Sequence, residues 1–382
     1  MNRLHHLDAA RALFLLLGIP FHVATTAIMI LSPEAPGFRE APAIALSLSL
    51  IHTFRMSAFF MLSGFFAAMV REKRGQGPWF ADRLIRVGVP LVASVASLAV
   101  IQYHLKVGLS EQWAGGFHGL PLAFEHLWFL IVLLLFVCTF SLFPLRWRSA
   151  GAPWRNALAL RGWRALGLIL GLALWGALLA GAAYGLELQD NEAVFDQQLL
   201  IRYLQYAPAF GLGALAWHWR MGEHVFNLPL RRTLPLALPF VALHVWLDPM
   251  ARPAFGLPMD IDPMWRLVDG VASQVAGILA SLVAFGVLAR LASRPSKVVA
   301  FLVDGAMAIY LFHMTWAMIA ITLMARLLPT SPMPVVQWLV ISGLVLLASA
   351  GCYLLVRRNT LLALAFCGIR PQRGGATRPA RA

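Results

Sequence analysis

Charged residues are scarce in this chain of 382 residues: Asp, Glu, Lys and Arg together make up 13% of it, and hydrophobic residues 60%. Soluble globular domains carry about 25% charged residues, so the composition excludes an ordinary soluble protein. No polar segment is long enough to fold into a domain of its own. We therefore expect one integral membrane domain over residues 1–369, followed by a basic, disordered tail over residues 370–382 that lies near anionic lipid.

Cysteine is nearly absent, with only Cys138, Cys352 and Cys367 in the chain. All three lie in or beside apolar segments, and their spacing matches neither a disulfide framework nor a zinc site. No cluster of His, Cys and Asp has metal-ligand spacing, and neither a nucleophile elbow nor a Gly-rich phosphate loop is found. We therefore expect no metal site and no bound cofactor.

Acidic residues are also few: 17 Asp and Glu stand against 31 Lys and Arg, which gives a net charge of +14. Most of the basic residues fall in alternate loops and at the two ends of the chain, whereas the intervening loops hold most of the acids. The positive-inside rule then places both termini and the basic loops in the cytoplasm. We attribute the charge to membrane topology and expect no nucleic-acid partner.

Apolar segments long enough to cross a bilayer recur along the whole chain. They predict an all-α polytopic bundle of about ten transmembrane helices, and an even number of crossings agrees with two cytoplasmic termini. The segment at 233–247 is the least secure, because it is short and contains Pro235 and Pro239. The predicted spans are 9–31, 43–70, 84–104, 123–144, 163–185, 199–219, 233–247, 265–289, 298–325 and 335–356.

Two polar residues, Arg11 and His22, lie inside the first apolar segment. A charge near the bilayer centre costs about 2.5–3.5 kcal/mol on insertion scales, so such residues are functional-site candidates. On a continuous helix, eleven residues bring the two side chains back to one face, roughly 16 Å apart. Asp8, one turn before Arg11, is the expected partner of its guanidinium. We predict Arg11 near one membrane surface and His22 near the bilayer centre.

The second span carries another polar stripe. His52 and Arg55 are three residues apart and share a helix face, to which Ser63 returns three turns later. Such residues can simply bind acids or carbonyls between helices, but two stripes of this kind favour a functional site. Ser63 is a remote candidate for an acyl-enzyme nucleophile. The pair Ser63-Gly64 also permits a close helix approach or a local break.

Arg83 and Arg86 begin the third span at its predicted cytoplasmic end. Three residues apart on a helix, they form a two-pronged cation that can hold phosphate groups. Basic residues that merely flank a membrane span would show the same spacing, and spacing alone favours that second interpretation.

Two further histidines are site candidates. His126 begins the fourth span beside Glu125, where it either contacts a polar substrate or marks the membrane interface. His313 lies inside the ninth span, with Asp304 on the opposite helix face. A positioned histidine usually takes or gives a proton, and this is the role predicted for His22.

Several strings of residues resemble the membrane-bound acyltransferase-three family. The resemblance runs in order along essentially the whole chain and is strongest over the first 130 residues. The strings that contain His22 and His52 are more specific to the branch of the family that modifies periplasmic glucans. They read Leu7-Asp8-x-x-Arg11, Gly18-Ile19-Pro20-Phe21-His22, Ile51-His52-x-Phe54-Arg55-Met56-x-x-Phe59-Phe60-x-x-Ser63-Gly64-Phe65, Arg83-x-x-Arg86-Val87-Gly88-x-Pro90 and His126-Leu127-Trp128-Phe129-Leu130.

The resemblance implies an inner-membrane O-acyltransferase. It would move a succinyl group from a cytoplasmic acyl-CoA to a hydroxyl of a periplasmic glucan. The expected co-substrate is succinyl-CoA. In this interpretation His22 is the catalytic base, Arg11 supports the site with Asp8, and Arg83 and Arg86 bind the phosphates of CoA.

Residue type alone assigns Arg55 to the distal carboxylate of the succinyl group, since a guanidinium matches a carboxylate bidentately. His52, Ser63, His126 and His313 complete the expected substrate-binding set. The expected partners are the glucan acceptor, the acyl-CoA donor, membrane lipid and other proteins of glucan synthesis.

Two alternatives remain open. One is the transfer of an acetyl or other acyl group to another envelope polysaccharide. The other is a proton-coupled transporter that uses His22, Arg11 and Arg55, although internal repeats typical of many transporters are not found. Residues 145–260 carry no recognisable motif, so they do not reveal the acceptor.

Overall fold

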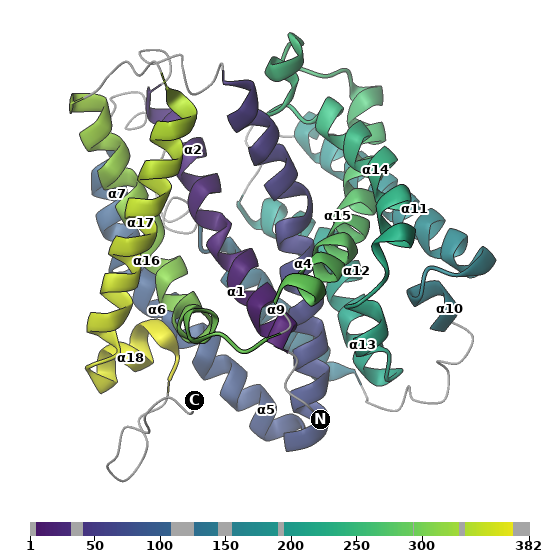
Figure 1. Cartoon of the computed structure of the whole chain (residues 1–382), viewed down its shortest axis with the longest axis horizontal. Coiled ribbons are helices and arrows are strands. Elements are labelled where there is room, and N and C mark those ends of the chain that lie inside the picture. The colour runs from purple at the N-terminus through teal and green to yellow at the C-terminus, as the bar shows by residue number, and fades with distance from the viewer. Residues whose placement is uncertain are drawn as a thin grey trace.

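The computed structural model describes residues 5–31, 41–107, 126–143, 155–189, 195–292, 294–327 and 333–369. In these ranges all regular structure is helical, and the long helices run side by side as a bundle (Figure 1). The predicted tail at 370–382 lies outside the described residues. The helices are α1 (His5–Leu16), α2 (Gly18–Leu31), α4 (Pro42–Arg74), α5 (Gln76–Arg83), the π-helix η1 (Leu84–Gly88), α6 (Val89–Ala96), α7 (Leu98–Val107), α9 (Trp128–Leu142), α10 (Arg155–Leu158), α11 (Gly162–Gln189), α12 (Phe195–His218), α13 (Gly222–Val225), α14 (Leu230–Leu247), the 3-10 helix η4 (Arg252–Phe255), α15 (Pro263–Leu291), α16 (Lys297–Leu327), α17 (Pro334–Val356) and α18 (Thr360–Cys367).

Each of the ten predicted spans contains a helix, but in the described part of the chain only seven helical segments are long and apolar enough to cross a membrane. The other three correspond to α9, α12 and α14. Helix α9 has only 15 residues, while α12 contains Pro208 and α14 contains Pro235 and Pro239. For these three, crossing stays a prediction. The seven segments are His5–Ile28, Pro42–Arg74, Gln76–Leu105, Gly162–Gly185, Pro263–Leu291, Lys297–Met324 and Pro334–Val356.

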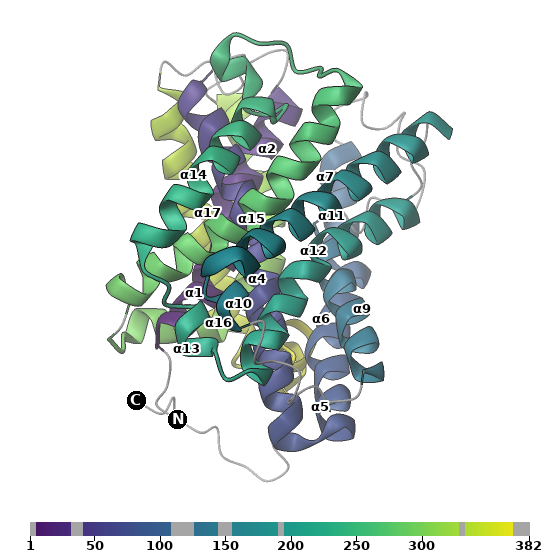
Figure 2. The same cartoon turned by 90° about the vertical axis from the view of Figure 1, so that its right-hand side faces the viewer.

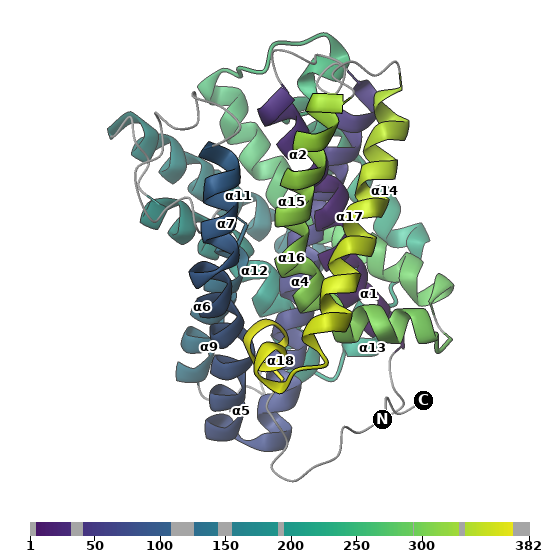
Figure 3. The ribbon, with the colours of Figure 1, turned by 90° about the vertical axis from the view of Figure 1, so that its left-hand side faces the viewer.

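Helix α4 lies at the centre of the bundle, in contact with α12, α15 and the α1–α2 segment (Figure 2). Helix α16 packs against α1, α2, α7 and α17 (Figure 3). In the most apolar 18-residue stretch of each helix, 67% of α4 is buried inside the protein but only 17% of α11. The leucines of α11 at 166, 170, 174 and 178 form an exposed stripe, as expected of a helix that faces lipid.

The two ends of the bundle differ. We call the end that holds α5, α13 and α18 the lower end, and the end that holds η4 and the start of α4 the upper end (Figure 1). Helix α1 begins and α18 ends at the lower end. The two described ends of the chain therefore lie on one side of the bundle, and the assignment of that side to the cytoplasm stays a prediction.

The first segment is a broken helix rather than the continuous one predicted. Helix α1 ends at Leu16, Leu17 forms a turn, and α2 begins at Gly18. Pro20 has no N–H to donate to the carbonyl of Leu16, so the helical ladder is interrupted at this point. A Cβ atom on Gly18 would lie 2.9 Å from Nη1 of Arg55, so glycine here lets α4 bring its guanidinium against the break.

The start of the third span is also irregular. Pro90 has no N–H for the carbonyl of Arg86, and the chain from Leu84 to Gly88 forms a π-helical turn, which changes the angle between Arg83 and Arg86. Gly368, which follows α18 with φ +64°, lies against the backbone of Arg86. A side chain at Gly368 would meet that backbone, so α18 depends on this glycine to approach the π-turn.

Glycine also sets the closest helix crossing, between α4 and α12. A Cβ atom at Gly64 would meet the backbone of Phe210, and one at Gly213 would meet the backbone of Met61. The close approach expected at Gly64 is present, and α4 continues through it without a break.

We therefore expect Gly213→Ala to destabilise the fold by about 1–3 kcal/mol, because backbone atoms cannot move aside for the added methyl group. Gly211→Ala is the matched control on the same helix, since nothing lies within 4 Å of its Cβ position. The measurement is the thermal unfolding of each purified variant in one detergent. Equal melting temperatures for the two variants would contradict this account of the crossing.

Candidate active site

Three histidines from distant parts of the chain meet inside the bundle. The ring centroids of His22 on α2 and His313 on α16 are 5.2 Å apart, and those of His126, just before α9, and His313 are 6.3 Å apart. His126 and His313 are buried, and His22 is partly buried. Within the described ranges, no group of three His, Cys, Asp or Glu side chains is arranged to hold a metal ion.

Tyr310 orients two of these histidines. Its hydroxyl donates to the backbone carbonyl of His126 at 3.0 Å, and its own carbonyl accepts a hydrogen bond from Nδ1 of His313. A carbonyl oxygen only accepts, so Nδ1 of His313 carries a proton, and Nε2 of the neutral ring holds a lone pair. Nε2 is buried and has no partner. The ring of His313 is thus fixed beside His22 with one nitrogen available.

Phe21 joins the stripe on α4 to the first segment. Its ring stacks on His52 with centroids 5.3 Å apart and meets His22 edge-on at 5.3 Å. Cζ of Arg55 lies 4.9 Å from the centroid of the same ring, a cation–π contact. The structure therefore brings His22, His52 and Arg55, from the polar stripes of the first two spans, together around one aromatic ring.

Arg55 is buried, with 3% of its surface exposed, and its Nε and Nη1 atoms have no hydrogen-bond partner. No ion pair joins Arg55 to a carboxylate in the described part of the chain. A buried charge without a partner is costly, and a bound anion would offset this cost.

Arg71 is a second buried arginine on α4, and its hydrogen bonds go to the end of α9 and to Gln76. It is 2% exposed, and its Nη2 atom donates to the carbonyl of Phe143 at 2.7 Å and to Oε1 of Gln76 at 3.0 Å. Further bonds to the carbonyls of Phe140 and Ser141 complete a cap on the end of α9. Arg71 also has one buried nitrogen, Nε, without a partner, but its two terminal nitrogens bind oxygen atoms, whereas Nη1 of Arg55 has no hydrogen-bond partner.

Sequence reasoning missed the side of this site formed by α12. Cζ of Arg202 lies 4.5 Å from the centroid of the Trp128 ring, which stacks on Tyr206 at 5.8 Å. Arg202 also acts electrostatically on His52 and Tyr310. The available signal was the spacing of Arg202 and Tyr206, four residues apart and so on one face of a polar helix segment.

A second group of cations occupies the lower end. Arg83 lies within electrostatic range of Arg11 and Arg86, and Nε of Arg86 forms an ion pair with Oδ2 of Asp82 at 2.9 Å. Asp8 provides the strongest attraction on Arg11, as its place one turn away suggested. This lower cluster lies roughly 16 Å from His22 along the first segment.

Ser63 is not part of the group around His22. It lies eight residues beyond Arg55 on α4, about 12 Å along the helix, and its hydroxyl donates to the carbonyl of Phe59 at 2.9 Å. Near the lower end, burial raises the pKa of the Cys367 thiol to about 11, so it stays protonated and weakly nucleophilic at neutral pH. Neither residue is placed as a nucleophile at His22.

Comparison with known proteins identifies the family. A family model described as an acyltransferase domain matches residues 4–357. The chain belongs to this acyltransferase family. It is 30% identical over 330 residues to glucans biosynthesis protein C of Salmonella gallinarum (strain 287/91 / NCTC 13346), and 29% identical to the protein of that name from Salmonella schwarzengrund (strain CVM19633); each match covers 81% of both chains. No solved structure matches.

Proposed function

We propose that this acyltransferase moves a succinyl group from a CoA thioester, bound at the lower end, to a hydroxyl of a glucan that arrives from the upper end. The observation that carries the proposal is the buried guanidinium of Arg55, whose Nε and Nη1 atoms have no hydrogen-bond partner. A cation able to bind an anion and a proton acceptor, His22, thus lie around the same ring of Phe21. The name of the Salmonella relatives supports a glucan acceptor.

His22 acts as the base in this reaction. It takes the proton of the acceptor hydroxyl as the oxygen attacks the thioester carbonyl carbon. The new C–O bond forms, the C–S bond breaks, and the proton passes from His22 to the departing thiolate. His313 packs beside His22, and His126 packs beside His313. We infer that these rings limit the access of water and so the hydrolysis of the thioester.

Arg55 selects the acyl group. A succinyl thioester ends in a carboxylate, which accepts two parallel hydrogen bonds from a guanidinium. An acetyl group has no charge to offer and would leave Arg55 buried without a partner. The state of Arg55 therefore favours a dicarboxylic acyl group over the acetyl alternative.

Arg11, Arg83 and Arg86 bind the phosphates of CoA at the lower end, with the thioester arm extended along the first segment towards His22. Arg74 also acts on Arg83, so four guanidinium groups repel one another here, and the three acids Asp8, Asp82 and Asp304 offset only part of their charge.

We expect Arg83→Gln combined with Arg86→Gln to raise KM for succinyl-CoA at least tenfold, with little change in kcat. Each charged hydrogen bond lost costs about 1.5–3 kcal/mol, and each 1.4 kcal/mol is a factor of ten. Arg231→Gln, an exposed cation at the start of α14, is the control. If both variants raise KM alike, the effect is general surface charge rather than a phosphate site.

The proposal requires the lower end to face the cytoplasm of the inner membrane. In a cysteine-free background, we expect Asp260→Cys to react with a membrane-impermeant maleimide in cells whose outer membrane alone is opened. Gly77→Cys, exposed on α5, should react only after the inner membrane is disrupted. The reverse pattern would invert the topology and with it the sidedness of the donor.

The direct test uses the purified protein in lipid nanodiscs with radiolabelled succinyl-CoA and unmodified glucan. We expect succinyl esters on the glucan and a clear preference over acetyl-CoA. Preference for acetyl-CoA would favour the alternative acyl group, and absence of any transfer would contradict the proposed reaction.

A further inference from the structure

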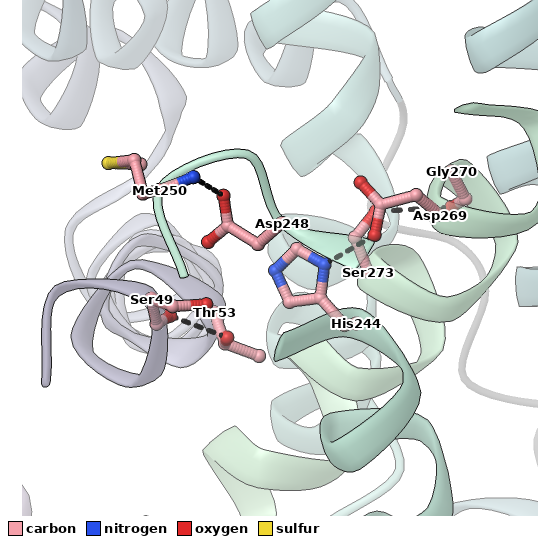
Figure 4. A network of polar contacts seen from close by, with 8 residues as sticks. All are labelled: Ser49, Thr53, His244, Asp248, Met250, Asp269, Gly270 and Ser273. Atoms are coloured by element: carbon pink, nitrogen blue, oxygen red, sulfur yellow. Dashed lines mark hydrogen bonds and ion pairs between the residues drawn. The ribbon is translucent and has the colours of Figure 1, made fainter. Parts of the chain in front are cut away.

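A second polar cluster lies towards the upper end of the bundle, and the chemistry above makes no use of it. It consists of His244 on α14, Asp248 at the end of α14, and Asp269 on α15 (Figure 4). Nδ1 of His244 and Oδ1 of Asp269 are 2.7 Å apart, and the two residues form an ion pair when the ring is protonated. We call these three residues the upper cluster.

Asp248 has one carboxylate oxygen without a hydrogen-bond partner in this cluster. The residue is 5% exposed, and its Oδ1 atom accepts the N–H of Met250 at 3.0 Å, but its Oδ2 atom is buried without a partner. An ionised carboxylate only accepts hydrogen bonds, so Oδ2 requires a donor. Hydroxyl groups are donors of that kind, and burying the oxygen without one is unfavourable.

His244 is oriented towards the same place. Oδ1 of Asp269 accepts a hydrogen bond from Nδ1 of His244, which fixes the orientation of the ring. Figure 4 shows the second ring nitrogen turned towards Asp248 and towards the stretch of α4 that carries Ser49 and Thr53. That nitrogen can accept a hydrogen bond from a hydroxyl when the ring is neutral, or donate one when it is charged. A carboxylate oxygen and an imidazole nitrogen therefore face one region beside α4.

His52 connects this region to the reacting group. It is the neighbour of Thr53 on α4, it lies within electrostatic range of Asp248 and His244, and its Nδ1 atom is buried without a partner. Its ring stacks on Phe21, which in turn meets His22. Two partnerless polar atoms, Oδ2 of Asp248 and Nδ1 of His52, thus lie towards the upper end, away from the lower cluster of arginines.

The end of α14 and the start of α15 carry two exposed indole rings. Trp246 and Trp265 are 41% and 46% exposed, and their centroids are 5.9 Å apart. Trp265 lies one turn before Asp269, whereas Trp246, two residues from both His244 and Asp248, lies on the other side of α14. Exposed aromatic faces at this end of the bundle suit a ligand that has both apolar C–H faces and hydroxyl groups, as a sugar ring does.

We propose that Asp248, His244 and His52 bind hydroxyl groups of the acceptor sugar, and that Asp269 acts as a positioning residue for His244. This subsite holds the sugar so that one hydroxyl reaches His22 from the upper end. The proposal rests on the proposed function and extends it by naming the residues that recognise the acceptor.

The test compares Asp248→Asn with Asp260→Asn, an exposed acid in the same upper segment. The amide keeps the size of the side chain but replaces one accepting oxygen with a donor. We expect Asp248→Asn to raise KM for glucan at least tenfold while KM for succinyl-CoA and the slow hydrolysis of succinyl-CoA without glucan stay unchanged. Asp260→Asn should leave all three values at the wild-type level. An unchanged KM for glucan, or an equal rise in both KM values, would overturn the proposal.

Direct binding separates this proposal from the proposed function. Glucan binding to the wild-type protein is measured by calorimetry in nanodiscs without acyl-CoA, alongside both variants and His244→Gln. Binding that weakens at least tenfold in Asp248→Asn and His244→Gln, but not in Asp260→Asn, supports the subsite even if succinyl transfer fails. Equal binding by all four proteins, or none by the wild type, overturns it.

Discussion

His22→Ala should lower kcat for succinyl transfer by about 10²–10⁴-fold, the usual contribution of a positioned acid–base group. KM for succinyl-CoA should change little, because the proposed phosphate site at the lower cluster lies roughly 16 Å away along the first segment. The measurement is steady-state transfer by purified variants that insert and melt like the wild type. Alanine removes the proton acceptor while the neighbouring rings of Phe21 and His313 remain.

His104→Ala controls for the loss of a histidine that is exposed near the end of α7. We expect its kcat to equal that of the wild type. A His22→Ala enzyme with near-normal kcat, or with only a raised KM, would assign His22 to binding and would remove the base from the mechanism. His313→Gln should fall between the two, since its ring is fixed beside His22 but is not the proposed base.

Arg55→Lys should lower kcat/KM for succinyl-CoA by about 10–150-fold and leave the much slower use of acetyl-CoA nearly unchanged. The expected loss corresponds to about 1.5–3 kcal/mol for charged hydrogen bonds that an ammonium group cannot arrange bidentately. The diagnostic quantity is the ratio of the two kcat/KM values, because it cancels losses of folded protein.

Arg71→Lys is the matched control, a buried arginine of the same helix whose bonds all go to neighbouring residues. It should lower the melting temperature without changing the ratio. If Arg55→Lys lowers activity with both donors equally, Arg55 serves the shared thioester carbonyl or the fold, and the carboxylate assignment is wrong.

The sequence located the polar stripes of the first two spans but did not by itself derive their meeting. His22, His52 and Arg55 lie on segments joined by a short connection, and each segment has a polar stripe with helical spacing. Where such neighbours pack, a buried polar stripe on one finds the polar stripe on the other. The structure places all three around Phe21.

Contacts between distant spans could not be derived in this way. The positions of His126 and His313 depend on how α9 and α16 pack, which local periodicity does not encode, and Tyr310, which fixes both, has no motif of its own. The break at Leu17 was missed because the spacing argument assumed a regular helix despite Pro20. The upper cluster lay in a region without recognisable motif.

Arg55 and Arg71 illustrate the same limit within one helix. Both are arginines in α4 and both are buried, so neither propensity nor hydropathy separates them. Only packing shows that the terminal nitrogens of Arg71 cap carbonyl groups at the end of α9, while Nη1 of Arg55 has no hydrogen-bond partner. The proposed role of Arg55 therefore rests on its nitrogen atoms without hydrogen-bond partners rather than on its residue type.

The central claim is that the protein adds succinyl groups to glucan and that His22 is the base in this reaction. It is tested most directly by the charge of periplasmic glucans from a strain that lacks its own such enzyme and carries either the wild-type protein or His22→Ala, inserted in equal amounts. The account predicts anionic, succinylated glucans with the wild type and neutral glucans with His22→Ala. Anionic, succinylated glucans in the strain with His22→Ala would contradict it.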